Sequence, residues 1–286
     1  MKSSRMMLCA ALVWAAASVQ AVPVVLSAAG PNAASIQGTV DAFRASLGAL
    51  NPNVVGSVGS GRREINWDGV PDAFAAPNNL PGNFFNSNSP RGVVLTTPGS
   101  GFQVSANASV APNEFGDIDP NYPLFFASFS PQRLFTALGS NLTDVLFFIP
   151  GSTTAALTNG FGVVFTDIDL ANSTGIEFFD GADQSLGQFF APNVAGNETL
   201  SFLGVRFSEG SIVSRARITS GNQALAGGNT PNDLVVMDDF IFGEPAAAQV
   251  PEPSTLLLLL LGLALALGVR NTGAARSGFR RLSVLV

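Results

Sequence analysis

The chain has 286 residues, of which 47% are hydrophobic and only 12% are charged, against roughly 25% charged residues in an average globular protein. Residues 22–249 contain eight arginines and 19 acidic residues, a net charge of −11 that disfavours nucleic acid as a partner. There is no His, and the single Lys and Cys are Lys2 and Cys9. Once the first segment is removed, Ser-His and Cys-His nucleophile pairs, lysine Schiff bases and His/Cys zinc sites are excluded.

Residues 1–21 have the pattern of a secretory signal peptide that forms an N-terminal signal helix. Lys2 and Arg5 precede an apolar stretch over residues 6–17, and Val19 and Ala21 are small or aliphatic. This pattern predicts export through Sec-type machinery and cleavage after Ala21 by a signal peptidase. A retained anchor helix is the alternative, but the apolar stretch is short for a membrane span.

Residues 22–249 are predicted to form one exported body with one or two short helices. The sequence "TVDAFRASLG" over 39–48 predicts a helix that is capped by Thr39 and ended by Gly48. Its apolar stripe would consist of Val40, Phe43 and Leu47. A second short helix is predicted over 130–138.

The rest of the body is predicted to be mainly β. Seven apolar segments between residues 144 and 243 follow one another at intervals of about 10 to 14 residues, with turn residues between them. This spacing predicts an antiparallel meander within a β-sandwich or jelly-roll fold. In "FFDGADQSLGQFF", Asp180 and Gly181 would start a hairpin turn. Many strands are apolar on both faces, which indicates two packed layers.

A long loop rich in Pro, Asn and Gly is predicted over about residues 66–92. Its four prolines disfavour regular ladders, and a loop of this length packs as an Ω-type unit or has a binding role. Aromatic residues in this half of the chain are candidates for stacking against a carbohydrate, as in a lectin-like module. They are Trp67 and Tyr122, with Phe74, Phe84 and Phe85. The chain has 23 Phe and one Tyr, which favours core filling instead.

Four aspartates interrupt apolar strands and are candidate metal ligands. "FTDIDL" places Asp167 and Asp169 on one side of a strand, and Asp238 and Asp239 in "VVMDDF" would point to opposite faces. Carboxylates in a His-free protein suit Ca²⁺ at a sheet edge, and no other cofactor is indicated. Ion pairing is the alternative. The candidate partners are Arg206, Arg215 and Arg217. A two-carboxylate glycoside hydrolase is the enzyme class that this composition best allows, although 19 acids give the pattern little specificity.

The C-terminal segment, residues 250–281, has three parts. Pro251, Glu252 and Pro253 form a stiff, extended tripeptide, residues 254–269 form an apolar helix, and residues 270–281 form a basic tail. The helix is predicted to enter a membrane, with the basic tail inside and the body outside. The residues that would anchor it are Leu256, Leu260, Leu263, Leu267 and Arg270. A buried core helix is the alternative.

This segment, "VPEPSTLLLLLLGLALALGVR", resembles the PEP-CTERM sorting tag of Gram-negative bacteria. The resemblance implies export by a signal peptide, transient insertion in the inner membrane, and cleavage at the Pro-Glu-Pro motif by an exosortase. It also implies delivery to the cell surface or the extracellular polymer matrix, with extracellular polysaccharide as a potential partner. The sequences "GRREINWDGVPDAF" and "VVMDDFIFGEP" are similar to segments of other bacterial proteins that carry this tag. We therefore predict a non-enzymatic surface or matrix protein.

Overall fold

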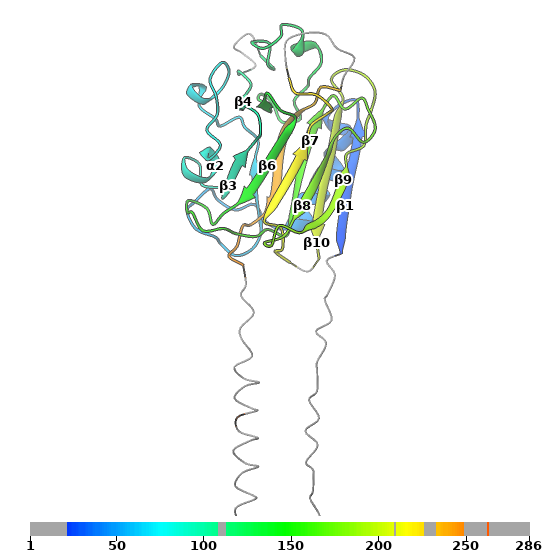
Figure 1. Cartoon of the computed structure of the whole chain (residues 1–286). Coiled ribbons are helices and arrows are strands. Elements are labelled where there is room, and N and C mark those ends of the chain that lie inside the picture. The colour runs from blue at the N-terminus through cyan, green and yellow to red at the C-terminus, as the bar shows by residue number, and fades with distance from the viewer. Residues whose placement is uncertain (1–21, 108–112, 209, 226–232, 249–261, 263–286) are drawn as a thin grey trace, which may run out of the picture. The chain divides into compact units, whose positions relative to one another are not determined.

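The protein is described from a computed structural model, which describes residues 22–107, 113–208, 210–225, 233–248 and Gly262. The chain divides into two compact units, Met1–Ala248 and Gln249–Val286. The first unit, here called the body, holds two antiparallel sheets and a few helices (Figure 1). The body is therefore mainly β, as the sequence predicts.

The larger sheet has seven strands, in the order β1-β10-β7-β12-β5-β4, with β2 paired to β12. The smaller sheet has five strands, in the order β3-β6-β11-β8-β9. Every pair of neighbouring strands is antiparallel. The strands are β1 (Pro23–Gly30), β2 (Arg62–Ile65), β3 (Val93–Thr96), β4 (Gly101–Val104), β5 (Phe135–Leu138), β6 (Leu142–Phe147), β7 (Gly160–Thr166), β8 (Gly175–Phe179), β9 (Ser185–Phe190), β10 (Leu200–Phe207), β11 (Arg215–Thr219) and β12 (Val236–Gly243).

The two sheets pack face to face through a phenylalanine-rich core. Phe147 of the smaller sheet contacts Phe161 and Phe242 of the larger one, with ring centroids 6.0 and 5.7 Å apart. These rings are at most 1% exposed. The Phe residues thus fill the core, as the composition predicts, and the packing fits the predicted β-sandwich.

The predicted first helix exists but begins earlier than expected. Helix α1 (Ala33–Leu47) is capped by Asn32, whose side-chain oxygen accepts a hydrogen bond from the Ser35 amide at 3.2 Å. Thr39 therefore lies inside the helix and does not cap it. Gly48 ends the helix as predicted, with φ +102°, a conformation that favours glycine.

The apolar stripe of α1 packs on the outer face of the larger sheet. Its buried residues are Ile36, Val40, Phe43 and Leu47, which include the three predicted ones. The ring of Phe43 lies against Gly162 of β7 and Gly204 of β10. A Cβ atom at Gly204 would lie 2.7 Å from that ring, so these two glycines let the helix approach the sheet closely.

The prediction of a second helix over residues 130–138 is wrong, because residues 135–138 form strand β5. Phe135 pairs with Val104 of β4 and with Met237 of β12. Its ring stacks on Trp67 with centroids 4.0 Å apart. These long-range contacts outweigh the local helical pattern.

All seven strands predicted between residues 144 and 243 are present, but they do not form a meander. Among them only β8 and β9 pair with a neighbour in sequence, and the other pairs join distant segments. The β8–β9 hairpin turns where predicted, and the Asp180 carboxylate accepts hydrogen bonds from the amides of Ala182 and Gln184.

The described body begins and ends at the same end of the sandwich. Pro23 of β1 pairs with Phe207 of β10, and the neighbouring β7 pairs its Phe161 with Phe242 of β12. Next to this row, Ala246 bridges to Leu157. The blue first strand starts and the orange last segment finishes at the lower end of the body in Figure 1. We call this end the exit end.

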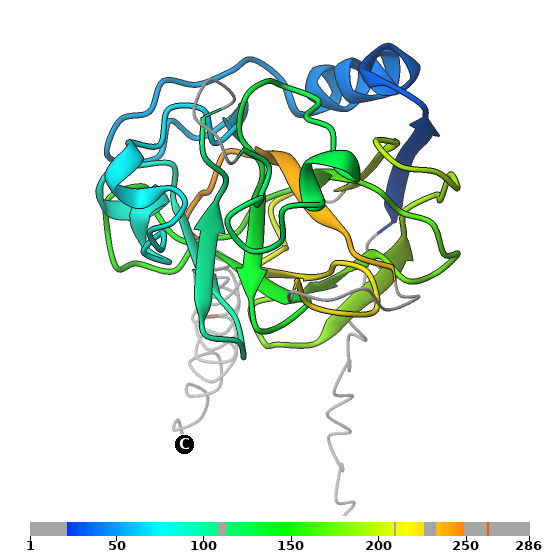
Figure 2. The same ribbon diagram turned by 90° about the horizontal axis from the view of Figure 1, so that it is seen from above.

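The segment 66–92 is irregular, as predicted, apart from two short helices. They are η1 (Asp72–Phe74) and α2 (Phe84–Ser87). In Figure 2 this segment, in cyan, lies at the left of the body, and the blue helix α1 lies at its upper right. A third described short helix, η2 (Tyr122–Leu124), precedes β5.

Candidate functional site

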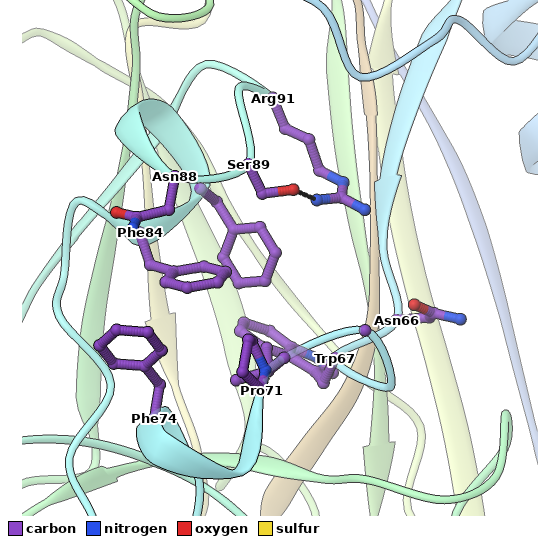
Figure 3. A pocket seen from close by; sticks show the side chains of 11 residues that line it. Asn66, Trp67, Pro71, Phe74, Phe84, Asn88, Ser89 and Arg91 are labelled. Atoms are coloured by element: carbon purple, nitrogen blue, oxygen red, sulfur yellow. Dashed lines mark hydrogen bonds between the residues drawn. The ribbon is translucent and has the colours of Figure 1, made fainter.

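The segment 66–91 encloses a cavity of about 320 Å³, here called the aromatic cavity. Its floor is buried and apolar, and is formed by Trp67, Val70, Phe84 and Phe85. Exposed or half-buried residues line its rim. They are Asn66, Gly69, Pro71, Phe74, Asn88, Ser89 and Arg91. Figure 3 shows Arg91 and Ser89 facing Pro71 and Trp67 across the cavity, with Phe74 and Phe84 on the side between them.

Among the described residues that line the aromatic cavity, Arg91 is the only charged one. It donates a hydrogen bond to the Ser89 hydroxyl, and its guanidinium lies 5.1 Å from the centroid of the Phe85 ring. Burial, together with the nearby charge of Arg63, lowers the pKa of Arg91 to about 10. Arg91 therefore remains cationic at neutral pH, in an environment that penalises its charge.

The two candidate stacking residues, Trp67 and Tyr122, are both buried, since each is only 1% exposed. One face of Trp67 stacks on Phe135, and its indole N–H donates to the Asp238 carbonyl at 2.8 Å. Tyr122 packs with Phe126 in a separate apolar cluster. Core contacts thus occupy both rings, although Trp67 also borders the cavity.

Phe74, Phe84 and Phe85, the other aromatic residues noted in the sequence, come together at the aromatic cavity. The ring centroids of Phe74 and Phe84 are 5.3 Å apart, and those of Phe84 and Phe85 are 5.0 Å apart. Sequence reasoning missed Arg91 and Ser89. The available signal was that Arg91 is the only basic residue between positions 66 and 92.

Asp238 and Asp239 form a buried carboxyl pair that does not point to opposite faces of β12. The pairing register of β12 with β7 shifts between Met237 and Phe240, so strand alternation fails there. Both carboxyls accept hydrogen bonds from the Ser130 hydroxyl. The Asp238 carboxylate also accepts hydrogen bonds from the Phe129 and Ser130 amides, at 2.6 and 3.1 Å.

Charge on this pair is balanced by α1. Arg44 donates to Asp239 at 2.9 Å and to Glu64 of β2 at 3.0 Å. Burial raises the pKa of both aspartates, and the adjacent Asp239 raises that of Asp238 further. These contacts connect α1, β2 and β12, which indicates that the cluster has a structural role.

Asp167 and Asp169 lie beyond the end of β7, so the predicted strand alternation does not apply to them. Asp167 has φ +71°, and its Oδ1 atom is buried without a hydrogen-bond partner. Burial, followed by the charges of Asp169 and Asp233, raises the pKa of Asp167 to about 8. The Asp169 carboxylate accepts a hydrogen bond from the Gly196 amide at 2.8 Å. The Asp233 carboxylate accepts one from the Asp169 amide, also at 2.8 Å.

The stability of the body is expected to fall as the pH rises from about 4 to 8, because of Asp167. The ordinary pKa of an aspartate is 3.8 and that of Asp167 in the fold is about 8, so within this window the folded protein holds a proton that the unfolded chain has released. Most of this window lies above pH 5, so Asp167→Asn should stabilise the body by about 1–3 kcal/mol more at pH 9 than at pH 5. Urea unfolding at both pH values measures the difference.

The exposed Asp41→Asn variant is the control, and its stability should follow wild type at both pH values. An equal effect of Asp167→Asn at pH 5 and pH 9 would contradict the prediction. A wild-type melting temperature that rises with millimolar Ca²⁺ at pH 9 would show that a cation, and not a proton, neutralises Asp167.

Of the four aspartates, only Asp239 forms an ion pair within the described residues, and its partner is Arg44 and not one of the three predicted arginines. Arg215 and Arg217 share a face of β11, as predicted, but both pair with Asp144 of β6, at 3.1 and 2.8 Å. Burial raises the pKa of Asp144, but the hydrogen bonds and charges of Arg217 and Arg215 outweigh it and the net shift is downward. Among the described residues Arg206 has no ion-pair partner.

The structure does not gather the four aspartates into one site. Asp238 and Asp239 lie with Arg44 and Ser130, whereas Asp167 and Asp169 lie with Asp233. Within the parts of the chain that the structure describes, no group of three or more His, Cys, Asp or Glu side chains is arranged to hold a metal ion.

The predictions for the signal peptide and for the sorting segment fall outside the described residues, apart from Gly262. These include the motif Pro251, Glu252 and Pro253 and the anchor residues Leu256, Leu260, Leu263, Leu267 and Arg270. Of the helices that lie in the described residues, none is long and apolar enough to cross a membrane.

Comparison with protein families finds one match, at the C-terminal end of the chain. The family model described as the PEP-CTERM protein-sorting motif matches residues 249–271. The chain therefore carries a PEP-CTERM sorting motif, which makes it a protein targeted for export and sorting across a membrane. Searches among curated proteins and among solved structures found no match to the chain.

Proposed function

We propose that this protein is a non-enzymatic component of the bacterial cell surface or extracellular matrix, delivered there by exosortase processing. The observation that carries the proposal is the PEP-CTERM motif at residues 249–271, directly after a folded β body. An exosortase would cut the chain near Pro251, Glu252 and Pro253, after a signal peptidase has removed the first 21 residues.

The arrangement of the body supports this route. Strand β1 begins and strand β12 ends at the exit end. The same end of the sandwich therefore carries both the start and the finish of the described body. Seven residues separate Gly243, the end of β12, from Pro251. The motif therefore follows the last strand of the body after a connection that is short in sequence.

The composition supports a role that is not enzymatic. A mature chain without His, Lys or Cys has no imidazole, side-chain amine or thiol for catalysis, which leaves carboxylates and hydroxyls as the candidate catalytic groups. The charge network at Asp238 and Asp239 binds backbone amides, Ser130 and Arg44, which gives it a structural role. The proposed surface or matrix role rests on the sorting motif and on the acidic composition of the body.

Glu252→Ala is expected to block release of the body. Glu252 is the only charged residue between Glu244 and Arg270, and it lies between two prolines, which favour an extended backbone. In the native host, the variant should accumulate in the membrane fraction with its tail uncut. Fractionation, blotting and mass spectrometry of the mature C-terminus measure retention and the site of cleavage.

Ser254→Ala, next to the motif, is the matched control and should be released like wild type. Release of Glu252→Ala at the wild-type rate would refute the role of the motif. If wild-type protein is cut but then found only in the free medium, sorting stands and the surface or matrix role fails.

A further inference from the structure

We propose that the aromatic cavity binds a small organic carboxylate with a flat, apolar body, and that Arg91 holds its carboxylate. The proposal goes beyond the sorting of the protein, since it concerns what the delivered body binds. It would make the protein a surface module with a defined small-molecule site.

The first argument is that Arg91 has hydrogen-bond donors that no carboxylate of the described residues uses. Of the eight arginines between residues 22 and 249, six form ion pairs with carboxylates of described residues. Arg91 forms none within this described part, and its Nε atom is buried without a hydrogen-bond partner. A half-buried guanidinium with donors to spare is a typical recognition element for a carboxylate.

The second argument is the shape and chemistry of the cavity. A volume of about 320 Å³ is at the lower end of the range of small-molecule sites, roughly 300–1,000 Å³. The buried floor is apolar, whereas the polar groups Asn66, Asn88, Ser89 and Arg91 lie at the rim. A ligand with an apolar body below and a charged group at the rim matches this division.

The aromatic walls favour a flat apolar body over a sugar. Phe74, Phe84 and Phe85 present rings without polar atoms, so they cannot satisfy the hydroxyl groups of a buried sugar. Phe85 also lies beneath the Arg91 guanidinium, so an aromatic ring and a carboxylate can be bound side by side.

The third argument is that both walls of the cavity are fixed in place by contacts outside it. Asn86 of α2 donates to the Ser152 carbonyl at 2.7 Å and accepts the Gly151 amide at 3.0 Å. On the opposite wall, Asp68 accepts the amides of Gln132 and Arg133 at 2.7 and 3.1 Å. The cavity is therefore formed before a ligand arrives, which lowers the entropic cost of binding.

The test compares phenylacetate with its neutral analogue phenylacetamide, by NMR titration of the full mature body. Wild type should bind phenylacetate about 10- to 100-fold more tightly than phenylacetamide, because only the acid forms charge-assisted hydrogen bonds with Arg91. Arg91→Gln should remove this preference, so that acid and amide bind equally. Arg206→Gln is the matched control, and it should keep the wild-type preference.

The preference of wild type for acid over amide tests the proposal even if Arg91→Gln fails to fold. Equal binding of the two compounds by wild type, or no binding of phenylacetate at millimolar concentration, would overturn it. So would tighter binding of galacturonate than of phenylacetate, which would assign the cavity to acidic sugars. None of these outcomes bears on cleavage at the sorting motif.

Discussion

Glu244→Ala is expected to lower the free energy of unfolding by about 3–5 kcal/mol, because it leaves the buried charge of Arg63 without its carboxylate counter-ion. The Arg63 and Glu244 side chains are 0% and 1% exposed. The guanidinium donates to both carboxylate oxygens, at 2.7 and 2.8 Å. Glu244 also accepts hydrogen bonds from Asn51 and the Val58 amide, so the variant loosens the loop over residues 51–58 as well.

Urea unfolding followed by circular dichroism measures this loss. Glu177→Ala removes a half-buried glutamate of β8 and is the matched control, with a change within about 0.5 kcal/mol. The double variant Arg63→Met/Glu244→Leu should lose less than the sum of the two single variants, since no charge is left buried. If the loss in the double variant equals the sum of the losses in the two single variants, Arg63 and Glu244 contribute to stability independently and not as an ion pair.

Trp67→Ala is expected to lower the free energy of unfolding by about 3–5 kcal/mol, because it leaves a cavity in the aromatic core. The indole stacks on Phe135 and meets the edges of Phe85 and Phe240, with centroids 5.3 and 5.0 Å away. Trp67→Phe should cost less, about 1–3 kcal/mol, because it keeps part of the packing but leaves the buried Asp238 carbonyl without its donor.

Circular dichroism is the appropriate probe, since Trp67 is the only tryptophan beyond residue 14. Phe190→Ala, an aromatic truncation at a ring that is 44% exposed on β9, is the matched control and should cost much less. If Trp67→Ala proves as mild as Phe190→Ala, the indole is not the centre of this core.

Much of the fold could be predicted from local patterns. The Val40, Phe43 and Leu47 stripe located α1, and turn residues marked the boundaries of β6 to β12. The pairing of the strands could not be predicted, because it depends on contacts between distant segments. Strand β5 shows the same limit, since its Phe135 takes its conformation from Trp67 and Met237 and not from its neighbours in sequence.

The candidate site was predictable only in part. The irregular, proline-rich character of residues 66–92 identified the segment, and the phenylalanines in it do line the cavity. The burial of Trp67 could not be read from the sequence, because it depends on β5 and β12. The bulge that turns Asp238 and Asp239 toward Ser130 likewise arises from the pairing of β12 with β7.

Strand β12 lies between β7 and β5 and also pairs with β2, yet it is the last strand of the body. A polypeptide that is threaded N-terminus first through a translocation channel delivers this strand after all of its partners. Until Val236–Gly243 emerges, β1, β10 and β7 have no strand to connect them with β5 and β4. After such a passage the larger sheet would therefore remain incomplete until almost the whole body has crossed.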